Sequence, residues 1–168
     1  MSPLILLTNP PPNFLISLVN RCKNVIGGLT ISPAINPVDR THDVEVQEAV
    51  EEDVLASKTA TLGGVSDMLR YGSLLLSRDY VNYPASTPLL IAHGDADNLN
   101  SFNASQEFID KVTARSKQLK RYPGARHELF MEADQLKYEV ARDVIAWLDN
   151  VLDEPVPVSA NVQATSKL

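Results

Sequence analysis

Residues 89–97 read Leu-Leu-Ile-Ala-His-Gly-Asp-Ala-Asp, a short apolar run that ends in a polar loop. Such a run, bounded by a proline on one side and a His-Gly pair on the other, is typical of a central parallel strand, which is apolar on both faces. Two acidic residues, Asp95 and Asp97, follow the predicted strand. In open α/β sheets, functional groups gather just beyond the carboxyl ends of the strands, so this loop is a candidate site.

A second short strand is predicted at 118–122, and it runs into Tyr-Pro-Gly-Ala-Arg-His at 122–127. The residues between the two strands predict a helix, with Asn103 and Gln106 placed as a capping pair. The apolar face of this helix consists of Ala104, Phe108, Ile109 and Val112. Residues 136–151 predict the best amphipathic helix of the chain. The order β-α-β-α favours an α/β fold with parallel strands and flanking helices.

The chain before residue 85 has a different character. Residues 3–7 are apolar and predict the end of a buried strand, parallel to the other two, so close to residue 1 that we expect upstream sequence to have been lost. Helices are predicted at 13–25, 43–53 and 64–77, and residues 30–41 predict an irregular excursion. No strand is expected in this middle section.

Composition excludes several classes of protein. A net charge of −6 and a pI near 5.0 argue against a nucleic-acid-binding surface, which needs a basic patch. Cys22 is the one cysteine, so there is no disulfide framework and no thiolate metal cluster, and we expect it to be a buried small hydrophobe. No nucleotide or metal motif is present, and no cofactor is expected.

The start of the chain lacks the basic residues and the length of a secretory signal, and no apolar run is long enough to span a membrane, which predicts a cytoplasmic protein.

The two predicted loops hold an acid and a base in a specific order. Asp97 follows one strand and His127 follows the next, as in the last two members of the Ser…Asp…His chain order of α/β-hydrolases. In that chemistry the histidine takes the proton of a serine hydroxyl, and the carboxylate holds the imidazole in the right tautomer and stabilises the imidazolium.

The same residues carry a resemblance to a known family. Residues 89–97 resemble the strand and acid loop of monoacylglycerol lipases, which belong to the serine aminopeptidase group of α/β-hydrolases. Lys-Arg-Tyr-Pro-Gly-Ala-Arg-His at 120–127 is similar to their histidine loop, in particular the fungal form, and Ser2-Pro3-Leu4 looks like the segment after the strand that follows the nucleophile.

This resemblance implies a partial α/β-hydrolase fold spanning 1–152, with a helical lid at about 8–85 and the acid and histidine loops within 86–152. Residues 153–168 are expected to form a disordered tail. The resemblance also implies that Asp97 is the catalytic acid of the triad and that His127 is the base. The implied substrate is an acylglycerol or another ester, and the lid implies peripheral contact with a membrane or lipid droplet.

Other residues compete for these roles. Asp95 is the alternative acid, although it occupies a variable family position, and Asp97 could instead be a turn or helix-cap aspartate. A surface loop position is the alternative for His127. His93 is expected to be a strand-end residue rather than a catalyst, and His42 to be solvated on the surface.

The nucleophile is the main departure from the family pattern. No serine of the chain lies in a Gly-x-Ser-x-Gly elbow, and the nearest match, Gly-Val-Ser-Asp-Met at 64–68, fails at its last position. Gly72-Ser73 lacks the spacing, and the family's early oxyanion-hole segment is missing too. We therefore expect a truncated serine hydrolase that is inactive alone. Two alternatives stay open, a non-catalytic module that binds lipid or a partner chain, and half of an esterase or peptidase of other specificity.

Overall fold

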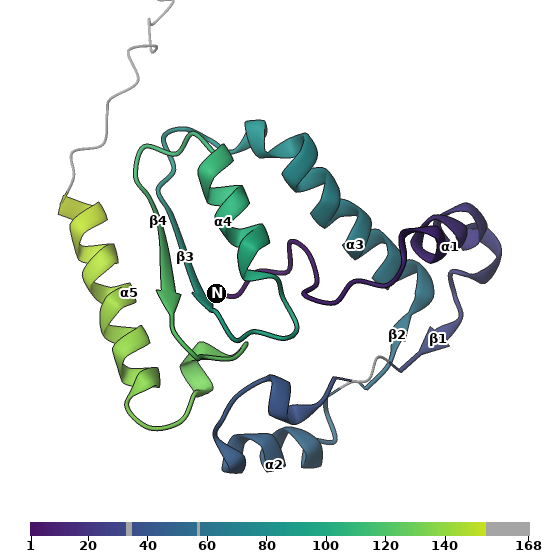
Figure 1. The fold of residues 1–168 in the computed structure, drawn as a ribbon, viewed down its shortest axis with the longest axis horizontal. Coiled ribbons are helices and arrows are strands. Elements are labelled where there is room, and N and C mark those ends of the chain that lie inside the picture. Colours follow the sequence, from purple (N-terminus) through teal and green to yellow (C-terminus); the bar gives the residue numbers. More distant parts are fainter. Residues whose placement is uncertain (33–34, 57, 154–168) are drawn as a thin grey trace, which may run out of the picture.

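The computed structural model describes residues 1–32, 35–56 and 58–153 (Figure 1). Its centre is a parallel pair of strands, β3 (Leu89–Gly94) and β4 (Lys117–Tyr122), in register from Leu89 opposite Lys117 to Gly94 opposite Tyr122. Helix α4 (Phe102–Lys111) connects the two strands, and α5 (Leu136–Asp153) follows β4 after the short 3₁₀ helix η3 (Leu129–Met131). The predicted β-α-β-α order and its parallel pairing are confirmed.

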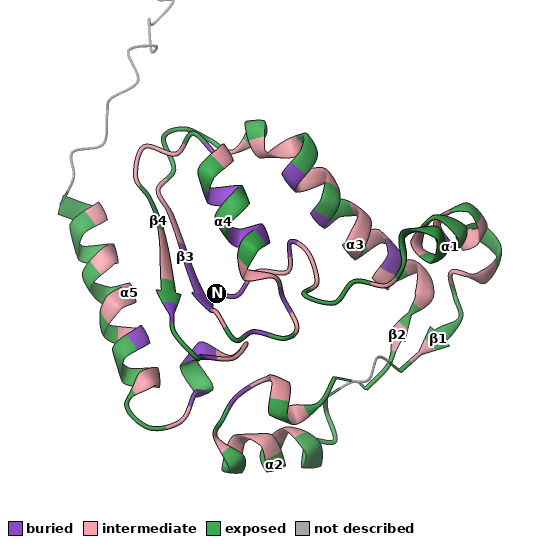
Figure 2. Cartoon of the chain, viewed as in Figure 1, coloured by how far each residue is buried: buried purple, intermediate pink, exposed green. Residues whose placement is uncertain are grey.

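The two helices cover opposite faces of this sheet. Successive residues of a strand point to opposite faces, and Ile91 and Ala92 accordingly belong to different apolar clusters. The first cluster holds residues of α4 and of the chain before the sheet: Ile5, Leu76, Ile91, Ala104, Phe108, Ile109 and Val112. The second reaches α5 and η3: Ala92, Tyr122, Ala125, Leu129 and Val140. Figure 2 shows these buried positions gathered along β3, on one side of α4 and in the adjoining loops.

The middle section is largely helical, as predicted. Helix α1 (Asn13–Ile26) packs on α3 (Leu62–Ser77), and α2 (Val44–Glu52) lies apart from them (Figure 1). Two 3₁₀ helices, η1 (Pro37–Asp39) and η2 (Asp79–Asn82), complete it. The structure also contains an antiparallel pair that the sequence did not predict, β1 (Thr30–Ile31) and β2 (Ala60–Thr61). Each strand has two residues, which is too short to produce a recognisable alternation.

The predicted strand at 3–7 is wrong. This segment makes one isolated antiparallel bridge, from Leu7 to Asn100, and Ser2 donates its N–H to the carbonyl of Ala92 at 2.8 Å. Ser2 has a positive φ of 40°, so the chain turns away from the edge of β3 after one hydrogen bond. The apolar character of residues 3–7 has another cause. Ile5 is buried in the first cluster, where it packs against α3.

Three smaller expectations also change. Ser101, not the predicted Asn103–Gln106 pair, caps α4, since its hydroxyl accepts from the N–H of Ala104 at 3.2 Å. Cys22 is half-buried rather than buried. Val19 is the one residue of α1 that is buried. The predicted tail lies outside the described residues apart from Asp153, which ends α5. No helix in the described ranges is both long and apolar enough to cross a membrane.

Candidate active site

The acid loop and the histidine loop pack directly against each other beyond β3 and β4. The backbone N–H of Asp95 donates to the carbonyl of Tyr122 at 3.2 Å, and that of Ala96 donates to Ala125 at 3.1 Å. Gly94 makes this approach feasible, because a Cβ at that position would overlap the carbonyl oxygens of Ala125 and Arg126. Glycine at the end of β3 thus lets the two loops meet.

This packing brings together the two residues that the sequence selects as acid and base. Nδ1 of His127 lies 2.9 Å from Oδ2 of Asp97. The carboxylate is fully enclosed, whereas the His127 side chain keeps 26% of its surface exposed. An ionised carboxylate only accepts hydrogen bonds, so Nδ1 carries the proton and Nε2 is left as the basic atom. Among the described residues, no hydrogen bond occupies Nε2.

A second imidazole, which sequence reasoning did not connect to the site, contacts the same carboxylate. His93 lies in β3, as expected, and is fully buried. Its Nε2 lies 3.2 Å from Oδ2 of Asp97 and 3.2 Å from the carbonyl of Asn100, while its Nδ1 lies 2.8 Å from the hydroxyl of Ser105. Because both neighbours of Nε2 are acceptors, Nε2 bears the proton and Nδ1 accepts from Ser105. No motif of the sequence indicates this contact, which depends on how the loop after β3 folds back.

The other carboxylate oxygen of Asp97 fixes the loop itself. Oδ1 accepts from the backbone N–H groups of Leu99, at 2.8 Å, and Asn100, at 2.9 Å. Burial raises the pKa of Asp97, but the hydrogen bonds from His127, His93 and Asn100 outweigh it and hold the pKa well below its ordinary value. Asp97 is therefore an ionised carboxylate whose two oxygens are surrounded by hydrogen-bond donors.

The competing carboxylate, Asp95, is engaged elsewhere. Its oxygens lie 2.7 Å from Nε of Arg121 and 2.6 Å from the backbone N–H of Gly124. The Gly124 hydrogen bond, followed by that of Arg121, lowers the pKa of Asp95. Asp95 thus clamps the turn after β4, and Asp97 is the carboxylate that contacts His127.

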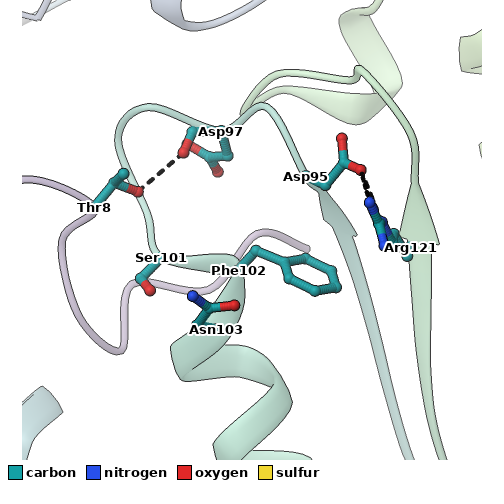
Figure 3. A pocket seen from close by; sticks show the side chains of 7 residues that line it. All are labelled: Thr8, Asp95, Asp97, Ser101, Phe102, Asn103 and Arg121. Atoms are coloured by element: carbon teal, nitrogen blue, oxygen red, sulfur yellow. Dashed lines mark hydrogen bonds and ion pairs between the residues drawn. The ribbon is translucent and has the colours of Figure 1, made fainter.

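An open pocket of about 340 Å³ adjoins the acid loop (Figure 3). The Arg121–Asp95 pair lies at one side of it, and Thr8 lies at the other, where its hydroxyl donates to the carbonyl of Asp97 at 2.9 Å. Asp97 turns its carboxylate away from solvent in this loop, toward the histidines. The full lining is Thr8, Asp95, Asp97, Ser101, Phe102, Asn103 and Arg121.

No serine in the described ranges donates a hydrogen bond to His127. Ser66, in the incomplete elbow pattern, lies within α3, is 4% exposed and donates to Asn20 at 2.9 Å. Ser105 is committed to His93. His42 is exposed, as expected, with 46% of its side chain accessible, and its Nδ1 also lies 3.1 Å from the buried carboxylate of Glu132. The described part of the chain contains no cluster of three His, Cys, Asp or Glu side chains arranged for a metal ion.

Comparison with known proteins places this geometry in a family. Residues 1–134 match the family model described as "Serine aminopeptidase, S33". The monoglyceride lipase of Saccharomyces cerevisiae is 34% identical over 90 residues, which make up 51% of this chain and 29% of that protein. The crystal structure of a soluble variant of that lipase, in complex with a substrate analogue, superposes with a TM-score of 0.77 at 25% identity, covering 89% of this chain and 54% of that one.

A second solved structure extends the likeness in fold. The monoacylglycerol lipase of Paleococcus ferrophilus gives a TM-score of 0.72 at 20% identity, covering 89% of this chain and 57% of its own. The match spans 28% and 29% of the length of the first two curated relatives, so this chain corresponds to part of such a protein. Since the family model covers most of its residues and the lipases share its fold, the chain belongs to the serine aminopeptidase S33 family of α/β-hydrolases and is similar to the monoacylglycerol lipases within it.

Proposed function

We propose that this chain is the acid- and histidine-bearing part of a serine hydrolase that cleaves monoacylglycerol esters. The observation that carries the proposal is the 2.9 Å contact between Nδ1 of His127 and Oδ2 of Asp97, at the carboxyl ends of two parallel strands. The substrate class is proposed from the lipases that the chain resembles. Because the chain spans only part of their length, the activity is that of a longer polypeptide.

In the proposed mechanism, a serine hydroxyl from outside these 168 residues lies within hydrogen-bond reach of Nε2 of His127. His127 takes the hydroxyl proton as the serine oxygen attacks the ester carbonyl, and the imidazolium then returns that proton to the departing glycerol oxygen. A water molecule attacks the acyl-enzyme in the same way, and the fatty acid leaves. Asp97 keeps the proton on Nδ1, so that Nε2 is the basic atom, and its charge stabilises the imidazolium.

We further propose that residues 8–85 form the lid above this site. Several large apolar side chains of α1 are exposed, with Phe14 at 72%, Leu18 at 53% and Val25 at 88%. An exposed apolar helix face is suited to contact with the lipid surface that presents such a substrate. This supports a peripheral encounter between the lid and a membrane or lipid droplet.

The test is to sequence the coding DNA upstream of Met1 and to assay the longest product for release of fatty acid from monoacylglycerol. We expect an in-frame Gly-x-Ser-x-Gly upstream and hydrolysis that a fluorophosphonate blocks. A gene without such a segment would contradict the proposal and favour a non-catalytic module that binds lipid or a partner. An active product that ignores monoacylglycerol but cleaves other esters would overturn the substrate class alone.

A further inference from the structure

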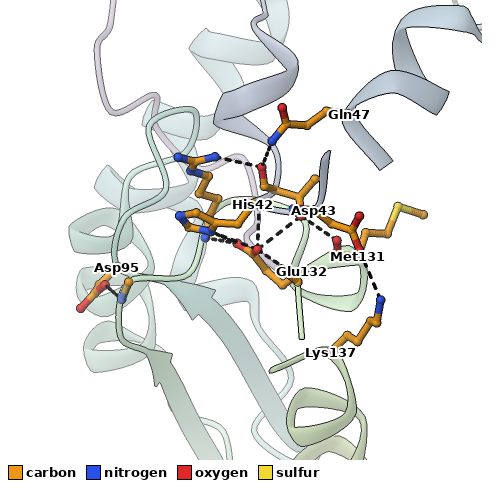
Figure 4. Close-up of polar contacts among 11 residues, drawn as sticks. His42, Asp43, Gln47, Asp95, Met131, Glu132 and Lys137 are labelled. Carbon is orange, nitrogen blue, oxygen red and sulfur yellow. Dashed lines mark hydrogen bonds and ion pairs between the residues drawn. The ribbon is translucent and has the colours of Figure 1, made fainter. Parts of the chain in front are cut away.

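A second buried carboxylate lies close to the proposed base. Glu132 follows η3, five positions after His127 in the sequence, and is 1% exposed (Figure 4). It plays no part in the proton transfers described above. A buried carboxylate is costly unless donors surround it, so its partners indicate what it is there to hold.

Those partners come from two distant parts of the chain. Oε1 of Glu132 accepts from the backbone N–H of Arg126, the residue before His127, at 2.6 Å. Oε2 accepts from the backbone N–H of His42 at 2.9 Å, and the ring Nδ1 of His42 lies 3.1 Å from the same oxygen. One carboxylate therefore joins the histidine loop to a segment of the proposed lid, as Figure 4 shows for His42 and Glu132.

The contacts around Glu132 reinforce this connection on both sides of His127. Arg126 donates from Nη1 to the carbonyl of Thr41 at 2.9 Å, and the backbone N–H of Glu128 donates to the carbonyl of Arg40 at 2.7 Å. The side chains of Arg40 and Glu128 also form an ion pair at 2.9 Å. The residues immediately before and after His127 are thus both bonded to residues 40–42.

The charge of Glu132 is part of the arrangement. Burial raises its pKa, but the N–H groups of His42 and Arg126 outweigh burial and lower the pKa below the ordinary glutamate value. The carboxylate accepts from three backbone N–H groups, those of His42, Arg126 and Ala133, and an anion makes stronger bonds with them than a neutral amide would. Replacing the carboxylate by an amide would place an NH₂ group against one of these N–H donors.

We propose that Glu132 is a positioning residue for His127. It holds the Arg126 backbone so that Nδ1 of His127 meets Asp97, and the position of His127 then depends on the position of residues 40–42. This inference rests on the proposed function, since it assigns importance to the His127–Asp97 contact. The alternative is that Glu132 merely stabilises the loop, and the two cases predict different spectra.

The experiment is NMR of the 168-residue chain with ¹⁵N-labelled histidine, comparing Glu132→Gln with the control Lys137→Gln. Lys137 lies at the same interface, 3.3 Å from Asp43, and within the described part of the chain it forms no hydrogen bond or ion pair with the histidine loop. In the unsubstituted chain we expect a protonated Nδ1 of His127 with a slowly exchanging proton. In Glu132→Gln that exchange should be faster by about tenfold or more, the size expected when a hydrogen bond to a charged group is lost. Lys137→Gln should leave it unchanged.

Each outcome separates the two proposals. A folded Glu132→Gln chain with the His127 signal of the unsubstituted chain would overturn the positioning role and leave the proposed function intact. An unsubstituted chain whose His127 carries no proton on Nδ1 would count against the acid–base pair itself. If Glu132→Gln does not fold, Glu132→Asp serves instead, because its shorter side chain keeps the charge but cannot reach Arg126 and His42 together. Unchanged His127 exchange in that variant would equally overturn the proposal.

Discussion

Asp97 and His127 are joined through a single oxygen atom, with Oδ2 of the carboxylate 2.9 Å from Nδ1 of the imidazole. The same oxygen lies 3.2 Å from Nε2 of His93, and the other carboxylate oxygen accepts two backbone N–H groups. Asp97 therefore cannot rotate toward another partner without losing several hydrogen bonds at once. The proposed base is oriented by a carboxylate whose own position is set by these hydrogen bonds.

The first prediction concerns catalysis by the longer protein in which this chain is proposed to act. His127→Ala removes the base, and Asp97→Asn favours the wrong tautomer of the imidazole. Asp97→Asn should lower kcat for monoacylglycerol by roughly 10⁴-fold and His127→Ala by roughly 10⁶-fold, as for the corresponding residues of other serine hydrolases. Asp110→Asn, on the exposed side of α4, is the control and should retain activity. Substantial hydrolysis by the His127→Ala protein would rule out its role as the base.

The second prediction concerns the 168 residues alone. No Gly-x-Ser-x-Gly elbow is present, and Ser66 and Ser105 are buried and hydrogen-bonded to Asn20 and His93. An unactivated hydroxyl is a weak nucleophile. We expect no labelling by a fluorophosphonate probe under conditions that fully label the Saccharomyces cerevisiae monoglyceride lipase. Stoichiometric labelling, mapped by mass spectrometry to a serine of this chain, would refute the expectation.

The third prediction concerns acid stability. The pKa of Asp97 is lower in the folded chain than in the unfolded chain, where a carboxyl has its ordinary pKa of about 3.9. Its contribution is therefore fully present above about pH 5 and is lost progressively as the pH falls through the unfolded-state value toward the lower folded-state pKa. Urea unfolding between pH 7 and pH 3 should show a steeper loss of stability for the unsubstituted chain than for Asp97→Asn. Parallel pH dependences for the two chains would contradict this assignment.

The fourth prediction concerns the buried histidine. His93→Phe fills the space but removes the donor to Asp97 and leaves the hydroxyl of Ser105 without its acceptor. The free energy of unfolding should fall by about 1–3 kcal/mol, the range for stranding buried polar groups. Ser105→Ala leaves only the buried Nδ1 of His93 without a partner, so it should cost less than His93→Phe, toward the lower end of the same range of about 1–3 kcal/mol. Urea denaturation measures both, and a larger loss for Ser105→Ala than for His93→Phe would be inconsistent with the network.

The fifth prediction concerns the approach of the two loops. Gly94→Ala places a methyl group against the carbonyl oxygens of Ala125 and Arg126, which are backbone atoms and cannot move away as a side chain can. We expect the two loops to separate and the free energy of unfolding to fall by about 1–3 kcal/mol, the usual cost of overpacking. Gly28→Ala is the control, because its Cβ would meet no atom within 4 Å. Equal stability of the two variants would show that the loops are less tightly apposed.

The local pattern of the chain predicted much of the fold around the site. The apolar run at 89–92 reflects a strand that is buried on both faces, and the amphipathic periodicity of α4 and α5 reflects helices that are buried on one. Each pattern lies within a single stretch of residues, so it can be recognised from the local sequence. The apolar run at 3–7 was misleading for the same reason. Apolar residues report burial, and burial under α3 produces the same composition as burial within a sheet.

What the sequence by itself determined is the order of β3, α4, β4 and α5 and the two loops between them and after them, because a parallel β-α-β unit places the ends of both strands at one edge. Asp97 and His127 could therefore be paired in advance. Only the tertiary structure decided that Asp95 turns to Arg121 and Gly124, and that His93 shares the oxygen of Asp97. The tertiary structure alone also tied Glu132 to His42, about 90 residues away along the chain. Hydrogen bonds between distant segments leave no periodicity in the sequence, because their partners are chosen by where the backbone folds and not by spacing along it.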